Sequence, residues 1–186
     1  MKKKSKNILH LGCGFQKKAG SIGVDINPRS KADVVHDLNK CPYPFKTNTF
    51  TEIYAENILE HLDNIPKVME ELHRICKKDS KIKIVTSHFT SVDSFTDPTH
   101  KHFFTSRSFD YFIEGEDLYK YKYSKAKFKK INVKLGPLDT KNFLINFILK
   151  LINKNIVFYE KRLAFIFPVG VIHYELEADK TKNGEN

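Results

Sequence analysis

The amino-acid sequence predicts an α/β fold whose mostly parallel sheet is flanked by helices. Short apolar runs with the length of strands recur through the first half of the chain and end in glycine, proline or acidic residues, which is typical of buried strands. An amphipathic helical pattern then separates the fourth run from the fifth. Strands that alternate with helices form parallel sheets, because each crossover connection carries the chain back to begin the next strand in the same direction.

Each element is predicted from its local pattern. The clearest is the helix over residues 64–78, whose apolar residues form one stripe and whose last two residues are lysines at the negative end of its dipole. Residues 88–107 show no periodicity and predict a long loop, which is often functional in a compact domain. Strands are expected at residues 7–11, 21–26, 33–36, 51–55, 81–86, 128–135 and 171–178, and helices at 64–78, 106–112, 141–153 and 156–165.

The composition is that of a soluble globular protein, with 40% hydrophobic and 29% charged residues. A net charge of +10 would suit nucleic acid, anionic lipid or acidic substrates, but only four of the 32 basic residues are arginine, so the charge is a weak indication. No apolar run reaches the roughly 20 residues that span a membrane. Cys13, Cys41 and Cys76 are scattered, which argues against a disulfide framework and favours a cytoplasmic location.

A glycine pair follows the first predicted strand. Residues 8–15 read Ile-Leu-His-Leu-Gly-Cys-Gly-Phe, and its two glycines let the backbone turn tightly and approach a ligand at the carboxyl edge of the sheet. The second strand runs into Asp25, 11 residues beyond Gly14, where a carboxylate can accept hydrogen bonds from a ribose diol. A dinucleotide site would need a third glycine where Lys17 stands and an acid about 20 residues on. A nucleoside without phosphates fits better.

Two further tracts end at the same predicted edge. Asp37 and Leu38 follow the third strand and can offer a carboxylate and an apolar side chain to an adenine ring, although an ordinary turn aspartate is the alternative. Glu56 and Asn57 end the fourth strand, and the chain continues as Ile-Leu-Glu-His-Leu. Because the carboxyl ends of parallel strands meet at one edge, the four tracts are expected to converge there.

Together these four tracts resemble the class I S-adenosylmethionine-dependent methyltransferases, in particular the compact methyltransferase type 11 group. The resemblance covers residues 8–87, and a looser similarity extends through residues 97–104 and 159–164. It implies a Rossmann-like fold with a seven-stranded, mostly parallel sheet that contains one antiparallel strand.

Chain length and the resemblance together indicate how the chain is divided. A length of 186 residues suits one domain, so residues 1–186 are expected to form a single domain. Within it, residues 7–87 would be the cofactor-binding half, and residues 88–178 would supply the substrate loop and the C-terminal part of the sheet.

The cofactor that the resemblance implies is S-adenosylmethionine. The two glycines would lie against its methionine part, Asp25 on the ribose, Asp37 and Leu38 at the adenine, and Glu56 and Asn57 along the floor. The full set of implied cofactor-binding residues is His10, Gly12, Cys13, Gly14, Asp25, Ile26, Asp37, Leu38, Glu56 and Asn57. At position 10 most of the wider family carries an acid near the α-amino group, and a histidine there supplies no fixed negative charge.

Candidate catalytic groups lie in the loop after the fifth strand. Methyl transfer needs the acceptor aligned with the methyl group and, for a weak nucleophile, a base that removes a proton. His100, Asp97 and His88 are the expected catalytic residues, and surface histidines beside a plain Asp-Pro-Thr turn are the alternative. The same side chains together with His102 could instead chelate a metal, but loop residues have no fixed geometry, and we do not predict a metal site.

The sequence does not identify the methyl acceptor. We expect a small molecule, a lipid or a glycan, and the alternatives are a nucleic-acid methyltransferase or a non-catalytic S-adenosylmethionine-binding protein. The fourth strand ends in Glu-Asn-Ile-Leu rather than in the Asn/Asp-Pro-Pro-aromatic tetrad that resembling enzymes use for exocyclic amines of bases. Residues 119–125 alternate tyrosine with lysine and could stack bases, but a solvated edge is the expected interpretation.

One apolar segment remains. Residues 142–152 are apolar around most of a helical circumference, and such a helix is usually buried. We therefore expect it beneath the last two strands. The alternatives are a cap over a hydrophobic substrate, peripheral contact with a membrane surface, or a homodimer face.

Overall fold

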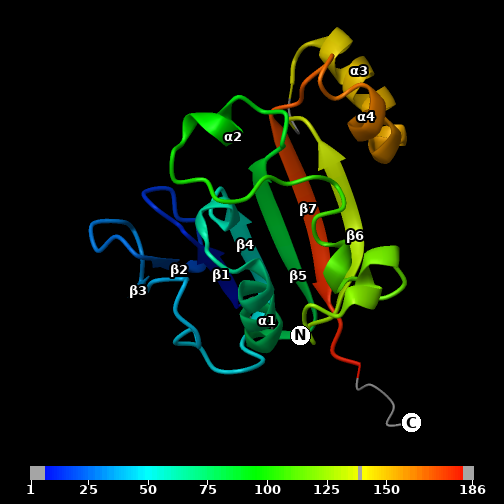
Figure 1. Ribbon diagram of the computed structural model, residues 1–186. Coiled ribbons are helices and arrows are strands. Elements are labelled where there is room, and N and C mark those ends of the chain that lie inside the picture. Colours follow the sequence, from blue (N-terminus) through cyan, green and yellow to red (C-terminus); the bar gives the residue numbers. More distant parts are fainter. Residues whose placement is uncertain (1–6, 138–139, 182–186) are drawn as a thin grey trace, which may run out of the picture.

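A computed structural model describes residues 7–137 and 140–181, within which seven strands form one sheet in the order β3-β2-β1-β4-β5-β7-β6 (Figure 1). Neighbouring strands are parallel except that β7 runs antiparallel to both β5 and β6. The predicted mixed α/β sheet is confirmed. The strands are β1 (Ile8–Leu11), β2 (Ser21–Asp25), β3 (Val34–Val35), β4 (Phe50–Glu56), β5 (Cys76–Ser87), β6 (Phe128–Leu135) and β7 (Val171–Ala178).

Helix α1 (Ile65–Ile75) joins β4 to β5. It begins at Asn64, whose side chain accepts a hydrogen bond from the Lys67 N–H at 3.0 Å and so caps the helix. The predicted helix over residues 64–78 is too long at its C-terminus. Cys76 already has extended backbone angles and pairs with Phe50 of β4, so the lysines at 77 and 78 belong to β5 and do not interact with the helix dipole.

The two faces of the sheet differ because side chains alternate along each strand. Leu9, Ile53, Ile82 and Leu176 lie in register on neighbouring strands and are fully buried, and they form one core with the apolar side of α1. The opposite face carries cross-strand ion pairs. They are Lys83 with Glu52 at 2.7 Å, Lys81 with Glu175 at 2.7 Å and Lys129 with Glu177 at 3.3 Å.

Residues 12–20, all of them described, connect β1 to β2 by turns without a helix. This agrees with the short spacing between the glycine pair and Asp25. After β5 the predicted long loop is present and contains one helical turn, α2 (Asp93–Thr96). The helix expected at 106–112 is only a 3₁₀ turn at Asp110–Phe112.

Helices α3 (Phe143–Lys154) and α4 (Ile156–Arg162) project beyond the sheet next to the ends of β6 and β7 (Figure 1). The expectation that residues 142–152 are buried beneath the last strands is wrong, since no residue of α3 is buried. The reason is that α3 meets the sheet along one edge, where Leu149 covers Gly136, Asn153 bonds to Leu135 and Ile152 is partly buried against the core. Among the described residues, no helix is both long and apolar enough to cross a bilayer.

Candidate functional site

The glycine loop stands at the carboxyl end of β1. Gly12 has a φ of 56° and Gly14 a φ of 47°, a left-handed conformation that side chains disfavour. At Gly12 a Cβ atom would lie 2.6 Å from the side chain of Ile58, which follows β4. At Gly14 no heavy atom lies within 4 Å of the Cβ position. The loop is therefore closed against β4 at its first glycine and open at its second, as a cradle for a ligand requires.

Asp25 ends β2 beside this loop. Its Oδ2 accepts a hydrogen bond from the Gly14 N–H at 2.8 Å, and its Oδ1 accepts one from the Asn27 N–H at 2.8 Å. Each carboxylate oxygen can accept a further hydrogen bond, so the half-buried side chain remains available to a hydroxyl group. The neighbouring Ile26 is exposed.

The tract after β3 is arranged differently. Asp37 is half-buried, and its Oδ1 accepts a hydrogen bond from the Asn39 N–H at 3.0 Å. Leu38 packs in the core with 4% of its surface exposed, and its carbonyl oxygen accepts a hydrogen bond from the Tyr43 hydroxyl at 3.0 Å. Asp37 can therefore reach a ligand at this edge, whereas the Leu38 side chain is occupied by its neighbours.

His10 and Glu56 lie together on the polar face of the sheet. The His10 Nδ1 accepts a hydrogen bond from the Lys18 N–H at 3.2 Å, and burial lowers the pKa of the ring. The Glu56 carboxylate forms an ion pair with the Lys18 ammonium at 2.9 Å and lies 3.9 Å from the His10 Nε2. Both side chains thus stabilise the turns that follow the glycine pair.

A cavity of about 650 Å³ lies at the carboxyl ends of β4 and β5. Asn57, which follows β4, lines it and has a left-handed φ of 50° held by a hydrogen bond from its N–H to the Val85 carbonyl. The next residue, Ile58, packs on Gly12. The cavity and the glycine loop are therefore neighbours on either side of this turn.

Three side chains with ionisable or metal-binding groups meet in that cavity. They are His61, from the 3₁₀ helix η1 (Leu59–His61), and Asp97 and His100 from the loop after β5. One ligand atom from each lies within 4.8 Å of the others, and the two imidazole rings are 4.7 Å apart. The Thr99 hydroxyl donates to the Asp97 Oδ1 at 2.7 Å and lies 2.8 Å from the His61 Nδ1. Hydrogen bonds from Thr99 lower the pKa of Asp97, so that this carboxylate is ionised at neutral pH.

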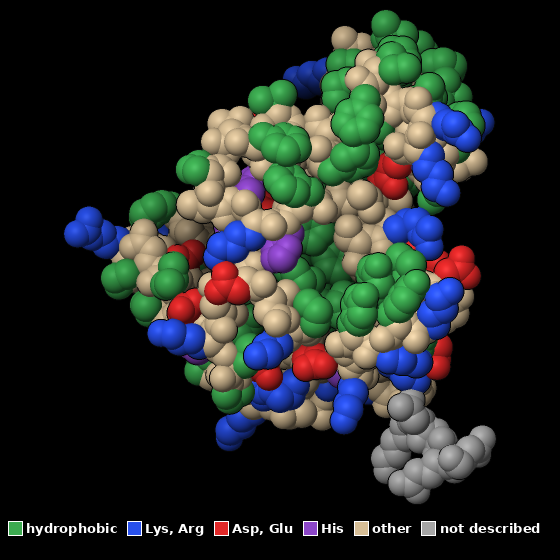
Figure 2. Space-filling model, in the orientation of Figure 1, with side chains coloured by type: hydrophobic (Ala, Val, Ile, Leu, Met, Phe, Trp, Pro, Cys, Tyr) green, Lys and Arg blue, Asp and Glu red, His purple; other side chains and the backbone are tan. Residues whose placement is uncertain are grey.

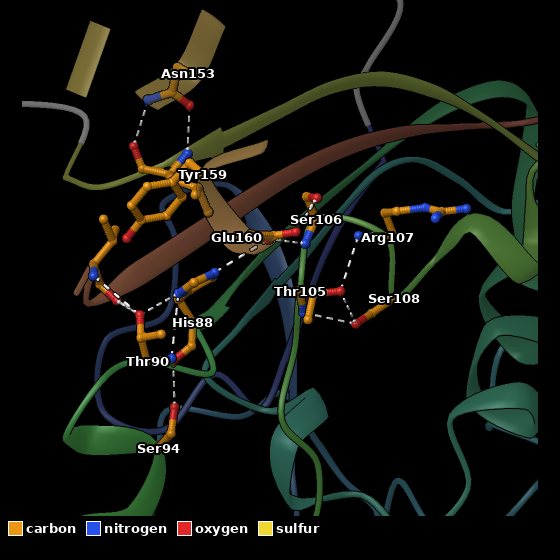
Figure 3. A network of polar contacts seen from close by, with 12 residues as sticks. His88, Thr90, Ser94, Thr105, Ser106, Arg107, Ser108, Asn153, Tyr159 and Glu160 are labelled. Atoms are coloured by element: carbon orange, nitrogen blue, oxygen red, sulfur yellow. Dashed lines mark hydrogen bonds and ion pairs between the residues drawn. The ribbon is translucent and has the colours of Figure 1, made fainter. Parts of the chain in front are cut away.

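His88 belongs to a separate, buried network (Figure 3). Its Nδ1 lies 2.7 Å from the Thr90 hydroxyl, and its Nε2 lies 3.3 Å from Glu160 on α4. Glu160 also accepts hydrogen bonds from the N–H and the hydroxyl of Ser106, at 2.6 and 2.7 Å. Burial by itself raises the pKa of Glu160, but the hydrogen bonds from His88 and Ser106 outweigh it and hold the pKa below its ordinary value.

Comparison with known proteins finds a family match over part of the chain and a shared fold over nearly all of it. Residues 9–84 match the family model described as "Methyltransferase domain". A solved S-adenosylmethionine-dependent methyltransferase from Archaeoglobus fulgidus is 23% identical, with 94% of this chain and 87% of that chain aligned at a TM-score of 0.56. The chain therefore carries a methyltransferase domain match over residues 9–84 and shares its fold with solved S-adenosylmethionine-dependent methyltransferases.

Other solved methyltransferases share the fold at lower identity. One from Mesorhizobium loti is 14% identical over 94% of this chain and 93% of that chain, with a TM-score of 0.56. Phosphoethanolamine N-methyltransferase 2 from Haemonchus contortus, solved with S-adenosyl-L-methionine, is 13% identical over 97% of this chain and 50% of that chain, with a TM-score of 0.58. No curated protein matches this chain.

The structure brings together only part of the catalytic set predicted from the sequence. Asp97 and His100 share the cavity, whereas His88 has no exposed surface. His102, the fourth residue named as a possible metal ligand, donates a hydrogen bond from its Nε2 to the Leu62 carbonyl oxygen at 2.8 Å and does not line the cavity. The sequence does not predict His61 as a site residue, although it lies in the Leu-Glu-His-Leu tract after the fourth strand. The reason is that no local pattern places residue 61 beside residue 100.

Proposed function

We propose that this protein is a methyltransferase that transfers the methyl group of S-adenosylmethionine to an oxygen or nitrogen atom of a small-molecule, lipid or glycan acceptor bound in the cavity beside Asn57. The observation that carries the proposal is the position of the cavity. It opens at the carboxyl ends of β4 and β5, one turn away from the glycine loop. Ligands of α/β sheets bind at this edge, and the arrangement leaves room for cofactor and acceptor side by side.

The proposal assigns the cofactor to the edge formed by the glycine loop, Asp25 and Asp37. The open space over Gly14 and the spare lone pairs of Asp25 fit a ribose and an amino-acid chain without phosphates. S-adenosylmethionine supplies a methyl group that is already activated as an electrophile. The protein then has to hold the acceptor in line and remove its proton.

We assign proton removal to His100. Its Nδ1 lies 3.1 Å from the Ser94 carbonyl oxygen, and a carbonyl can only accept, so Nδ1 carries the hydrogen and Nε2 keeps a free lone pair. The Asp97 carboxylate lies in the same cluster as the His100 ring. Asp97 and His61 are positioning residues in this scheme. His88 holds the loop after β5 in place through its contacts with Thr90 and Ser94.

Replacing Asp25 by alanine tests the cofactor assignment. We expect the variant to bind S-adenosylmethionine more weakly by about 1.5–3 kcal/mol, the range for hydrogen bonds to a charged group, measured by titration calorimetry. Asp33→Ala is the matched control, because Asp33 also accepts a backbone hydrogen bond, from the Gly23 N–H at 2.7 Å. An affinity lowered equally in both variants would show that Asp25 acts only through the loop.

Replacing His100 by alanine tests the catalytic assignment. We expect transfer of labelled methyl groups to fall by about 10²–10⁴-fold, as for loss of a general base, while cofactor affinity is retained. His102→Ala is the matched control. A normal rate of methyl transfer in the His100→Ala variant would show that His100 is not the base. If a chelator abolishes the activity of the wild-type protein and Zn²⁺ restores it, the general-base role is wrong and a metal ion held by His61, Asp97 and His100 takes its place.

A further inference from the structure

Exposed large hydrophobic side chains are concentrated on one part of the molecule, the hairpin surface, which we define as residues 143–167. Figure 2 shows them over α3 and α4 at the top of that view. Phe143 and Phe165 have 84% and 83% of their surface exposed. The exposed hydrophobic residues of this surface are Phe143, Leu144, Ile145, Phe147, Ile148, Leu151, Val157, Phe158, Phe165, Ile166 and Phe167.

The hairpin surface is anchored to the body through Tyr159 of α4 and the nearby Ala164, both buried in the core, and through the C-terminal half of α3. Asn153 accepts from the Leu135 N–H at 2.8 Å and donates to the Leu135 carbonyl at 2.9 Å. Beside it the Leu149 side chain lies over Gly136, where a Cβ atom would come within 2.4 Å. Most of the other apolar side chains of α3 are exposed. Patches of this extent on a monomer mark an interaction site.

The charges around this apolar surface have one sign. Lys150 and Lys154 lie one turn apart on α3, and Lys141, Lys161 and Arg162 are also exposed. The acidic residue of the segment, Glu160, is bound by His88 and Ser106. A second copy of the chain docked by the same face would bring these cations together without acidic partners. An anionic lipid surface is complementary to both the cations and the apolar side chains.

A groove between α3 and α4 adds a second observation. It has a volume of about 350 Å³ and is lined mainly by apolar side chains, among them Ile148, Leu151, Phe158 and Phe167. Such a groove suits a lipid acyl chain better than a polar peptide, because its walls offer few hydrogen-bonding partners.

The hairpin surface continues toward the loop that carries α2. Phe165 contacts Phe89 with ring centres 5.6 Å apart, and Phe95 and Phe103 stack at 4.8 Å with both side chains exposed. Residues of α2, Asp93 and Thr96, line the cavity assigned to the acceptor. The apolar surface and the cavity therefore share this loop.

We propose that the hairpin surface docks onto anionic lipid bilayers, with the apolar side chains of α3 and α4 in the headgroup region and the lysines against lipid phosphates. Docking places the α2 loop next to the lipid, so that the acceptor is a molecule carried by the membrane. This last step rests on the proposed function, whereas the docking itself does not.

Vesicle co-sedimentation tests the docking. The full chain is mixed with phosphatidylcholine vesicles that contain phosphatidylglycerol, and with pure phosphatidylcholine vesicles, at low and physiological ionic strength. We expect binding to the anionic vesicles that weakens with salt. Lys150→Glu/Lys154→Glu should bind at least about 30-fold more weakly, since each lysine near an anionic surface contributes about fivefold. Phe147→Ser/Leu151→Ser should lose binding at both ionic strengths.

The matched control is Lys77→Glu/Lys78→Glu, which makes the same charge change at exposed positions at the start of β5. We expect it to retain vesicle binding. Failure of the wild-type chain to bind anionic vesicles, or equal losses in the two charge variants, would overturn the proposal. So would a dimer that Phe147→Ser/Leu151→Ser dissociates while vesicles bind neither protein. Thermal unfolding and S-adenosylmethionine affinity, measured on every variant, separate failure of docking from misfolding and from failure of the cofactor assignment.

Discussion

The two sides of the turn at Asn57 are built by different means. On the glycine-loop side, backbone-to-backbone hydrogen bonds hold the loop in place. The Cys13 N–H bonds to the Val24 carbonyl at 3.2 Å and the Lys31 N–H to the Gly14 carbonyl at 2.8 Å. On the acceptor side, side chains from distant segments meet. His88 and Glu160, for example, are 72 residues apart in sequence.

Because of this difference, the two sides should tolerate different kinds of substitution. A loop held by backbone hydrogen bonds depends on the conformations its residues can adopt, so a single added methyl group can spoil it. A site held by side chains depends on particular partners, so its weak points are the groups that would be left buried and alone. Substitutions on the two sides are therefore expected to differ in their effects on stability and on cofactor affinity.

The largest effect is expected on the glycine-loop side. Gly12→Ala places a side chain at a positive φ and drives it into Ile58, and we expect it to reduce the free energy of unfolding by about 2–5 kcal/mol, from backbone strain and overpacking together. Gly20→Ala is the control. It also has a positive φ, of 74°, but nothing lies within 4 Å of its Cβ position, so only the strain of about 1–3 kcal/mol remains. Equal losses in urea titrations of the two variants would contradict the clash with Ile58.

An intermediate effect is expected on the acceptor side. Glu160→Ala leaves His88 buried and takes the acceptor from both polar groups of Ser106, and we expect a loss of about 2–4 kcal/mol in unfolding free energy. Glu114→Ala removes an exposed ion pair with Lys127 and should cost at most about 1 kcal/mol. Calorimetric affinity for S-adenosylmethionine should stay unchanged in both. A large loss of cofactor affinity in Glu160→Ala would show that the two sides are coupled.

The smallest effect concerns pH. Burial lowers the pKa of His10 on the glycine-loop side and of His173 on β7. The folded state therefore binds fewer protons than the unfolded state, and the stability that the neutral rings contribute is present above the unfolded value of about 6.5 and is lost as pH falls through the folded pKa values. Unfolding free energy should fall between pH 7.5 and 5.5, and His10→Asn or His173→Asn should each flatten that slope. A slope that neither variant changes would assign the effect to other groups.

The same contrast explains what sequence alone could predict. The glycine pair, Asp25 and Asp37 are read from neighbours along the chain, and the structure gathers them at one edge because parallel strands end there. The strands at 128–135 and 171–178 coincide with their predicted bounds because alternation and turns mark both ends. Local chemistry is sufficient for these features.

Features that depend on tertiary contacts were not predictable in this way. The apolar stripe of α1 runs on to residue 76, and only pairing with Phe50 shows that the strand has begun by then. The apolar segment 142–152 has the pattern of a buried helix, yet how much of it the sheet covers depends on where the chain leaves β6. His61 joins His100 through a loop whose path no local pattern specifies.

The ion-paired face of the sheet has a consequence for association. A bare sheet face commonly attracts another layer, but here two lysines on this face of β5 already have a carboxylate on a neighbouring strand, Lys83 with Glu52 and Lys81 with Glu175. Any protein that covered this face would have to strip water from paired charges, and the attraction within the pairs seldom repays that desolvation. Association is therefore favoured at the hairpin surface and disfavoured on the ion-paired face of the sheet.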